Sequence, residues 1–328
     1  MRPITQSQIR ARRRTDRIAI AAPGDFMLEA SQTIAREDAA RLNALPYCLD
    51  FARRRFIYVG GVDGREAQRA PFYYLHLRRN AQSVLSIPWE VGGLHLGADK
   101  SPIFLFSPGR CGSTLLSRIL SAADCPNVSE PDFYSQATAA FWSSPLNPLR
   151  AKIRDAVADM GSDLCMVTGD ATVVKLRAES CRAPQMLVQP NESRTLFMTR
   201  GFESWARSNI RAFRNPPGKT AGKYLCALTA HAWLKRNSNV HLIRYEDLLV
   251  DPAAATAALG TFLGRAIPAG VARATMTEDS QGGTPLAQGA RGDLPGWERR
   301  FDATMALWNS ARLKKARDRL DVSEAEAG

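Results

Sequence analysis

The sequence predicts an α/β protein whose main domain has three layers, α/β/α, around a central parallel sheet, with a small α+β extension at the N-terminus. The first observation behind this prediction is a short apolar run at residues 103–106, followed by a glycine-containing turn and a helical pattern. The second is that the buried-strand patterns at residues 194–200 and 239–245 also run into helical patterns. Alternating strands and helices are typical of parallel sheets covered by helices. A chain of 328 residues is long enough for such a domain and its extension.

The composition is that of an ordinary globular protein. Hydrophobic residues make up 45% and charged residues 23% of the chain, and no run of about 18 apolar residues occurs, so no membrane span is expected. The N-terminus has no apolar signal core followed by a cleavage site. The six cysteines are scattered without C-x-x-C spacing, which predicts reduced thiols and a cytoplasmic location. With four histidines and no metal-ligand spacing, no metal ion is expected.

The formal net charge of +12 predicts an anionic partner. Nucleic acid, a membrane surface and a polyphosphorylated cofactor would each satisfy this charge. The arginine-rich run at residues 10–14 has the composition of a nucleic-acid-binding arm, but we interpret it as a solvated, flexible terminus. No RNA-binding aromatic pattern, zinc finger or heptad repeat accompanies it, so nucleic-acid binding is only a minor alternative.

Residues 1–100 form the predicted extension, and residues 101–328 form the main domain. Pro46 is expected to end the first helix of the extension, because proline cannot continue a helix. The role of the extension does not follow from its sequence. Its predicted elements are a helix over 33–43 and strands over 56–60, 71–77 and 83–87.

The turn after residues 103–106 has the features of a phosphate cradle. The first backbone N–H groups of the following helix have no partner inside the helix, and the helix dipole adds partial positive charge there. Arg110 adds a full charge, and two hydroxyl side chains add donors. The residues predicted to line this loop are Gly109, Arg110, Cys111, Gly112, Ser113 and Thr114.

This loop is not the nucleotide-triphosphate version. A Walker A loop has a lysine directly after its last glycine, whereas Ser113 follows Gly112 here and the charge lies earlier, at Arg110. The order of residues resembles [KR]-S-G-T-T, the 5′-phosphosulfate loop of sulfotransferases that use 3′-phosphoadenosine 5′-phosphosulfate (PAPS). Cys111 replaces the usual serine, and Ser113 replaces the first threonine.

A lysine and a glutamate are the candidates for acid–base and electrostatic roles. Lys175 is delivered by the strand pattern at residues 170–177, and it resembles a family lysine that stabilises the leaving phosphate. Cytosolic members carry a catalytic histidine two residues later, but Arg177 stands there in this chain, which moves the base role to Glu130. Pro131 is expected to keep Glu130 extended at the carboxyl edge of the sheet. The other interpretation is a loop glutamate that caps the next helix.

Two further segments resemble the parts of the family that bind the 3′-phosphate. Arg200 and Ser208 match the motif R-(x)7-S at the end of a strand and in the following helix. Arg291 and Gly292 align with a C-terminal glycine-rich loop, in which Ala290 replaces the family's first arginine. That loop is followed by matching aromatic residues, Trp297 and Phe301.

The sequence Arg-Tyr-Glu-Asp-Leu at residues 244–248 also recurs in this family. We interpret it as mainly structural. Glu246 and Asp247 are expected to cap the helix that they enter and to pair with nearby arginines.

Together these motifs appear in the family's order over residues 101–301, so the chain resembles a PAPS-dependent sulfotransferase with a P-loop NTPase-like core. The resemblance implies transfer of a sulfuryl group from PAPS to the hydroxyl or amine of a small molecule, glycan or lipid, with 3′,5′-bisphosphoadenosine (PAP) as product and no metal. Arg110, Glu130 and Lys175 would be the catalytic residues. The alternatives are a P-loop kinase or nucleotide hydrolase and a non-catalytic nucleotide-binding module. The sequence does not predict the acceptor or the oligomeric state.

Overall fold

The computed structural model describes residues 2–13, 19–94, 101–143, 149–169, 172–277 and 295–320. The chain forms two compact units, which are described separately. Unit one comprises Met1–Ile103 and Pro126–Leu187, and unit two comprises Phe104–Cys125 and Val188–Gly328. Residues 126–187 therefore group with the N-terminal extension, whereas the sequence division at residue 100 assigns them to the main domain.

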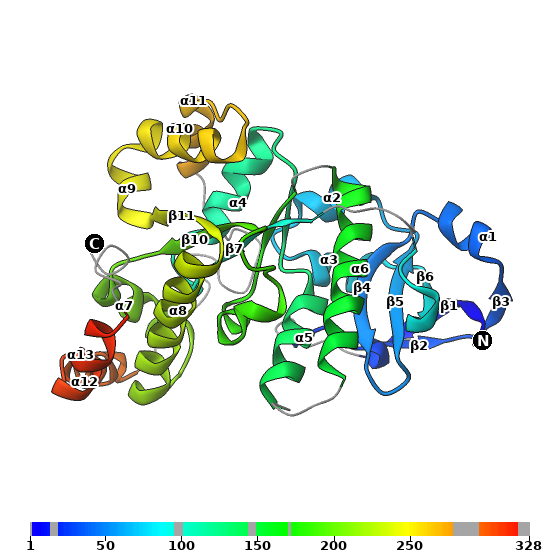
Figure 1. The fold of residues 1–328 in the computed structure, drawn as a ribbon, viewed down its shortest axis with the longest axis horizontal. Coiled ribbons are helices and arrows are strands. Elements are labelled where there is room, and N and C mark those ends of the chain that lie inside the picture. Colours follow the sequence, from blue (N-terminus) through cyan, green and yellow to red (C-terminus); the bar gives the residue numbers. More distant parts are fainter. Residues whose placement is uncertain are drawn as a thin grey trace. The chain divides into compact units, whose positions relative to one another are not determined.

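Unit one is built on a six-stranded sheet with the strand order β2-β1-β6-β5-β4, in which β3 also pairs with β1 (Figure 1). The pairings described within this sheet are antiparallel. Its strands are β1 (Ile4–Arg12), β2 (Phe26–Leu28), β3 (Gln32–Ile34), β4 (Leu45–Asp50), β5 (Arg55–Gly60) and β6 (Ser83–Pro88). A short parallel pair, β8 (Asn127–Ser129) and β9 (Val173–Lys175), also belongs to unit one.

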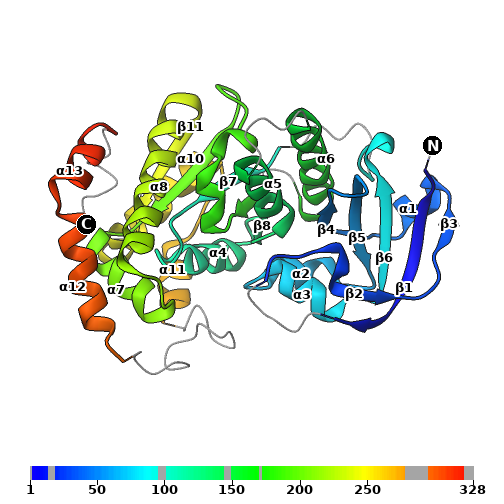
Figure 2. The ribbon, with the colours of Figure 1, turned by 90° about the horizontal axis from the view of Figure 1, so that it is seen from below.

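The helices of unit one cover this sheet and the parallel pair. Helices α5 and α6 pack against β4 and against each other, and α2 packs against β8 (Figure 2). The bounds of the helices are α1 (Arg36–Arg41), α2 (Gly64–Arg69), α3 (Tyr73–Asn80), α5 (Asp132–Ser143) and α6 (Arg150–Thr168). The predicted α+β character of the extension is confirmed.

Several sequence expectations for unit one are wrong in detail. The predicted strand at 71–77 is helix α3, because its buried side chains follow a helical rather than an alternating pattern. Pro46 does not stop a helix but lies in β4, since the helix has already ended at Arg41. The arginine-rich run was expected to be a flexible terminus, but its residues up to Arg12 belong to strand β1.

Helix α6 contains a glycine, Gly161, but continues past it to Thr168. Gly161 is needed for packing instead, because a Cβ there would lie 2.7 Å from the Tyr134 hydroxyl oxygen. The helix ends at Gly169, whose φ of 105° is a conformation that favours glycine.

Unit two contains the predicted parallel strands. Strand β10 (Arg194–Thr199) pairs in parallel with β7 (Ile103–Phe106) and with β11 (Asn239–Arg244). Figure 1 shows α4, α10 and α11 on one side of these strands and α7, α8 and α12 on the other. This arrangement confirms the α/β fold class with helices on both faces of a parallel sheet. The helices are α4 (Ser113–Ala122), α7 (Phe202–Ala212), α8 (Pro217–Asn237), α9 (Tyr245–Val250), α10 (Pro252–Leu263), α11 (Ala269–Met276), α12 (Trp297–Trp308) and α13 (Ala311–Asp318).

A cluster of aromatic side chains fixes helix α7 in unit two. The rings of Phe202 and Trp308 are stacked with their centroids 3.8 Å apart, which joins α7 to α12. Tyr224 of α8 meets Trp205 of α7 at 4.8 Å between centroids. Trp205 is fully buried, and large buried aromatic side chains contribute strongly to the stability of a core. Helix α7 therefore presents its polar residues from a rigid support.

Among the described residues, no helix is long and apolar enough to cross a membrane.

Candidate active site

The predicted phosphate loop lies between β7 and α4 in unit two. Its backbone has positive φ values at Gly109 (72°), Arg110 (58°) and Gly112 (88°). A positive φ at a non-glycine residue such as Arg110 is strained, and such strain is often found where a loop holds a ligand. Helix α4 begins at Ser113, and no described side chain caps its N-terminus. The loop therefore directs backbone N–H groups and the positive end of α4 toward one place.

Neighbouring elements of unit two hold this loop in shape. The Trp205 indole Nε1 donates to the Gly109 carbonyl oxygen at 2.6 Å. The Gly109 N–H donates to the Ser107 hydroxyl oxygen at 3.3 Å. Cys111 is buried, and its thiol donates to the Met198 carbonyl oxygen at 3.4 Å. The Cys111 side chain is thus turned into the protein, so only its backbone is suited to line the loop.

Gly112 has a packing requirement as well as a conformational one. A Cβ built on Gly112 would lie 2.4 Å from Cδ2 and 2.7 Å from Cε2 of Tyr245. It would also lie 3.1 Å from the Met198 Cε. Tyr245 belongs to the Arg-Tyr-Glu-Asp-Leu segment and forms a wall of the loop, a role that the sequence analysis missed. The only signal in the sequence for this role was that the Arg-Tyr-Glu-Asp-Leu segment recurs in the family that the motifs resemble.

The structure joins the phosphate loop to one of the predicted 3′-phosphate residues. The Arg110 Nε donates to the Ser208 hydroxyl oxygen at 3.3 Å, which connects the loop to α7. Arg200 has other partners: its Nε donates to the Ser204 hydroxyl oxygen at 2.9 Å, and its guanidinium lies 4.7 Å from the centre of the Tyr245 ring. Ser204, one turn before Ser208, is a polar residue of α7 that the sequence analysis did not select.

The two acidic residues of the Arg-Tyr-Glu-Asp-Leu segment have different partners. Asp247 forms an ion pair with Arg244 at 2.9 Å, which confirms the expected pairing with an arginine. Glu246 does not cap its own helix. Its Oε1 accepts a hydrogen bond from the Gly201 N–H at 3.0 Å, at the start of α7. A carboxylate there stabilises the positive end of that helix.

The remaining arginines of α7 contact the aromatic residues of α12. The Arg207 guanidinium lies 5.1 Å from the centre of the Phe301 ring, and the Arg211 guanidinium lies 5.4 Å from the centre of the Trp297 ring. Arg207 also pairs with Glu203 at 3.0 Å. Within unit two these cations therefore hold α12 against α7. The predicted residues Arg291 and Gly292, with Ala290, lie outside the described residues.

The predicted base and the strand lysine meet in unit one. The buried Lys175 Nζ lies 2.7 Å from the Glu130 Oε1 and donates to the Ser129 hydroxyl oxygen at 3.1 Å. Glu130 is not extended as expected, because its φ is 61°. Its N–H first completes the pairing of β8 with β9 by donating to the Lys175 carbonyl oxygen at 2.8 Å. The positive φ then turns the chain into α5 and leaves the carboxylate beside the lysine.

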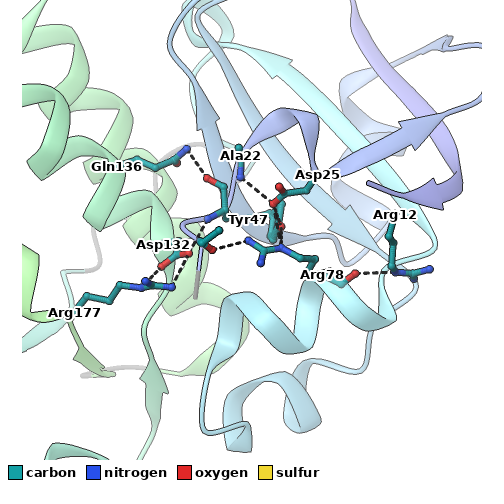
Figure 3. Close-up of polar contacts among 10 residues, drawn as sticks. Arg12, Ala22, Asp25, Tyr47, Arg78, Asp132, Gln136 and Arg177 are labelled. Carbon is teal, nitrogen blue, oxygen red and sulfur yellow. Dashed lines mark hydrogen bonds and ion pairs between the residues drawn. The ribbon is translucent and has the colours of Figure 1, made fainter. Parts of the chain in front are cut away.

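Arg177 links Glu130 to a second, fully buried carboxylate. Its Nε lies 3.7 Å from the Glu130 Oε2. The same Nε lies 2.7 Å from the Asp132 Oδ1 (Figure 3). The Ala21 N–H donates to the Asp132 Oδ2 at 2.7 Å. Burial raises the pKa of Asp132 to about 7, although Arg177 and the Ala21 N–H act in the opposite direction. Both oxygens of Glu130 thus face a cation, and the more deeply buried Asp132 titrates near neutral pH.

A neighbouring polar cluster ties the N-terminal extension to these residues (Figure 3). The buried Arg78 pairs with the buried Asp25 at 3.1 Å, and the Tyr47 hydroxyl donates to the same carboxylate oxygen at 2.5 Å. Arg78 also donates to the Ala19 carbonyl oxygen at 2.9 Å. These contacts fix the segment that carries Ala21, and through it the position of Asp132.

No described group of three or more His, Cys, Asp or Glu side chains could hold a metal ion.

No family model and no curated protein matches the sequence. Among solved structures, the chain is similar to the sulfotransferase domain from the Synechococcus PCC 7002 olefin synthase, with 17% identity and a TM-score of 0.42 over 69% of this chain and 95% of that one. It is also similar to the sulfotransferase domain from the curacin biosynthetic pathway (17% identity, TM-score 0.41, 67% of this chain and 96% of that one). A mouse sulfotransferase complexed with PAP matches at 15% identity and a TM-score of 0.37, over 67% of this chain and 89% of that one.

Proposed function

We propose that the protein is a PAPS-dependent sulfotransferase that moves a sulfuryl group from PAPS to an acceptor hydroxyl or amine. The observation that carries the proposal is the hydrogen bond between Arg110 and Ser208 in unit two. It connects the loop proposed for the 5′ end of the donor with the helix proposed for its 3′-phosphate. A site with separate positions for two phosphates, and with no lysine after Gly112, suits a bisphosphorylated nucleotide better than ATP.

In this proposal the donor is bound mainly by unit two. The backbone of the loop, the Arg110 guanidinium and the start of α4 with Ser113 and Thr114 bind the 5′-phosphosulfate. Ser208 and Arg200 bind the 3′-phosphate, with Arg200 supplying a rigid, multi-donor side chain. The stacking of Arg200 on Tyr245 supports this role, because it orients the guanidinium before the ligand arrives.

The chemical step is assigned to the pair in unit one. A bond forms between the acceptor oxygen or nitrogen and sulfur, while the bond from sulfur to the 5′-phosphate oxygen breaks and PAP leaves. Glu130 accepts the acceptor's proton, and Lys175 neutralises the charge that develops on the leaving phosphate. The 2.7 Å contact between them supports these roles, because the lysine side chain already lies beside the base. The proposal requires Lys175 and Glu130 to act on the donor that Arg110 binds.

The acceptor class is a hydroxyl or amine of a small molecule, glycan or lipid. A cytoplasmic location is part of the proposal, and it is supported by the six cysteines, which are scattered along the sequence without C-x-x-C spacing. No step assigned to the chain's own residues needs a metal ion.

The test is calorimetric binding of PAP and of ATP with Mg²⁺. PAP should bind more tightly than ATP, and Ser208→Ala should weaken PAP binding by about 0.5–1.5 kcal/mol, the usual worth of one hydrogen bond. The matched control is Arg236→Ala, which removes an exposed charge from the same unit at the end of α8 and should leave PAP affinity unchanged. Tighter binding of ATP with Mg²⁺ than of PAP would instead favour a P-loop kinase or hydrolase.

A further inference from the structure

The segment at residues 71–74 of the N-terminal extension contacts Lys175 and Arg177. It leads into helix α3; Lys175 is the last residue of strand β9 in the same unit, and Arg177 follows that strand by two residues. The Ser129 hydroxyl donates to the Pro71 carbonyl oxygen at 2.7 Å and accepts from the Lys175 Nζ at 3.1 Å. The lysine is therefore connected to the extension through one serine.

Each cation also faces an aromatic ring from this segment. The Lys175 Nζ lies 5.6 Å from the centre of the Phe72 ring. The Arg177 guanidinium lies closer, 4.3 Å from the centre of the Tyr74 ring. Both distances are within the range of cation–π interactions, which are stronger where water is excluded. Phe72 is half-buried and Tyr74 is buried, so the tyrosine contact is the stronger of the two.

Tyr74 is placed between two arginines. The Arg78 guanidinium lies 5.4 Å from the centre of its ring, in addition to Arg177. Burial raises the pKa of Tyr74 to about 12, so the ring is a neutral phenol at physiological pH. Arg78 is itself fixed by Asp25, and Arg177 by Asp132, so the ring joins two buried ion pairs.

We propose that Tyr74 is a positioning residue whose ring holds the Arg177 guanidinium between Glu130 and Asp132. The inference rests on the sulfotransferase function proposed above for what Glu130 does, but not for the placement of Arg177. The Nε of the arginine must stay near both carboxylates, 3.7 Å from Glu130 and 2.7 Å from Asp132, and its long side chain has several other rotamers. A fixed aromatic ring restricts those rotamers without placing another charged group beside the arginine. The N-terminal extension then acts as a support for the catalytic strand rather than as a separate module.

The test compares three substitutions at position 74 that differ in the ring. Tyr74→Phe keeps the ring and should retain PAPS turnover within about twofold. Tyr74→Leu removes the ring and should lower turnover about tenfold or more, the scale of a desolvated cation–π contact. Replacement of Tyr74 by 4-cyanophenylalanine keeps the aromatic ring but withdraws electrons from it, so its turnover should fall between those two. This third variant still tests the ring if Tyr74→Leu fails to fold.

Two further measurements separate positioning from a merely structural effect. PAP affinity should stay unchanged in all three variants, because Tyr74 belongs to unit one and the donor residues belong to unit two. The Asp132 carboxylate, observed by ¹³C NMR and assigned with Asp132→Asn, should titrate near pH 7 in the unaltered protein and in Tyr74→Phe. Its titration should move to higher pH in Tyr74→Leu, because a displaced Arg177 lowers the pKa of Asp132 less.

The outcomes distinguish this inference from the proposed function. Equal turnover and equal Asp132 titration in the phenylalanine, cyanophenylalanine and leucine variants would overturn the role of Tyr74. An unaltered protein that neither binds PAP nor consumes PAPS would overturn the proposed function instead. The NMR titration would still test the positioning of Arg177 in that case, since it needs no activity.

Discussion

Replacing Gly112 by alanine should damage the phosphate loop in two ways, through backbone strain and through overlap with Tyr245. The φ of Gly112 is 88°, and an L-residue in the left-handed region costs about 1–2 kcal/mol. The new Cβ would also lie 2.4 Å from the Tyr245 Cδ2, an overlap whose relief costs about 1–3 kcal/mol. The free energy of unfolding should therefore fall by about 2–5 kcal/mol. PAP affinity should fall as well, because a shifted loop no longer aims its N–H groups at the phosphate.

The control for this prediction is Gly264→Ala. Gly264 belongs to the same unit and has a φ of 69°, but a Cβ there would meet no atom within 4 Å. Gly264→Ala should therefore lower the free energy of unfolding only by the backbone cost of about 1–2 kcal/mol and should leave PAP affinity unchanged. The double variant Gly112→Ala with Tyr245→Ala removes the overlapping ring and should recover about 0.5–3 kcal/mol relative to additivity.

Chemical denaturation gives the unfolding free energies, and calorimetry gives the PAP affinities. If Gly112→Ala is no more harmful than Gly264→Ala in either measurement, the packing of Tyr245 against the loop is refuted. If the double variant shows no coupling, the clash is not the cause of the damage.

Three further predictions concern the ligand and the carboxylates. Glu130→Gln should lower the transfer rate about 10²–10⁴-fold, the worth of a general base, and leave PAP affinity intact; an unchanged rate would remove Glu130 from the mechanism. Arg200→Ala should weaken PAP binding by about 1.5–3 kcal/mol. It should weaken the binding of adenosine 5′-phosphosulfate, which has no 3′-phosphate, far less. Equal losses of both affinities in calorimetry would show that Arg200 does not bind the 3′-phosphate. The pKa of Asp132 is raised from 3.8 to about 7 on folding, so between these pH values the folded state binds a proton that the unfolded state has released. The folded state therefore loses stability as the pH rises through this range. The stability of Asp132→Asn relative to the unaltered protein should therefore increase from pH 4 to pH 7, and a flat difference in denaturation midpoints would contradict this.

The local patterns of the sequence predicted the strand, loop and helix around Arg110 correctly. The apolar run at 103–106, the glycines and the helical spacing after Ser113 each determine local structure without help from distant residues. The same holds for β10 and α7, where a buried strand is followed directly by a helix start. These elements carry most of the candidate donor site.

Features that depend on distant partners could not be predicted from the sequence. Residues 71–77 have the composition of a strand, and their helical state follows from the burial of Tyr73, Tyr74 and Leu77 in the tertiary structure. Pro131 excludes some backbone conformations of Glu130, but the observed positive φ also depends on the pairing of β8 with β9. The contact of Tyr245 with Gly112 joins segments that are far apart in the chain and have no local signal.

The most direct test of the account is whether the purified protein converts PAPS to PAP. The protein is incubated with PAPS and a set of hydroxyl- and amine-bearing acceptors, and PAP release is measured by chromatography. We expect PAP formation that increases with a suitable acceptor and falls about 10²–10³-fold in Lys175→Ala, the effect of removing one preorganised electrostatic contact. If PAPS remains intact while the protein binds PAP, or if Lys175→Ala releases PAP at the same rate, the claim that this chain is a sulfotransferase acting through Lys175 is contradicted.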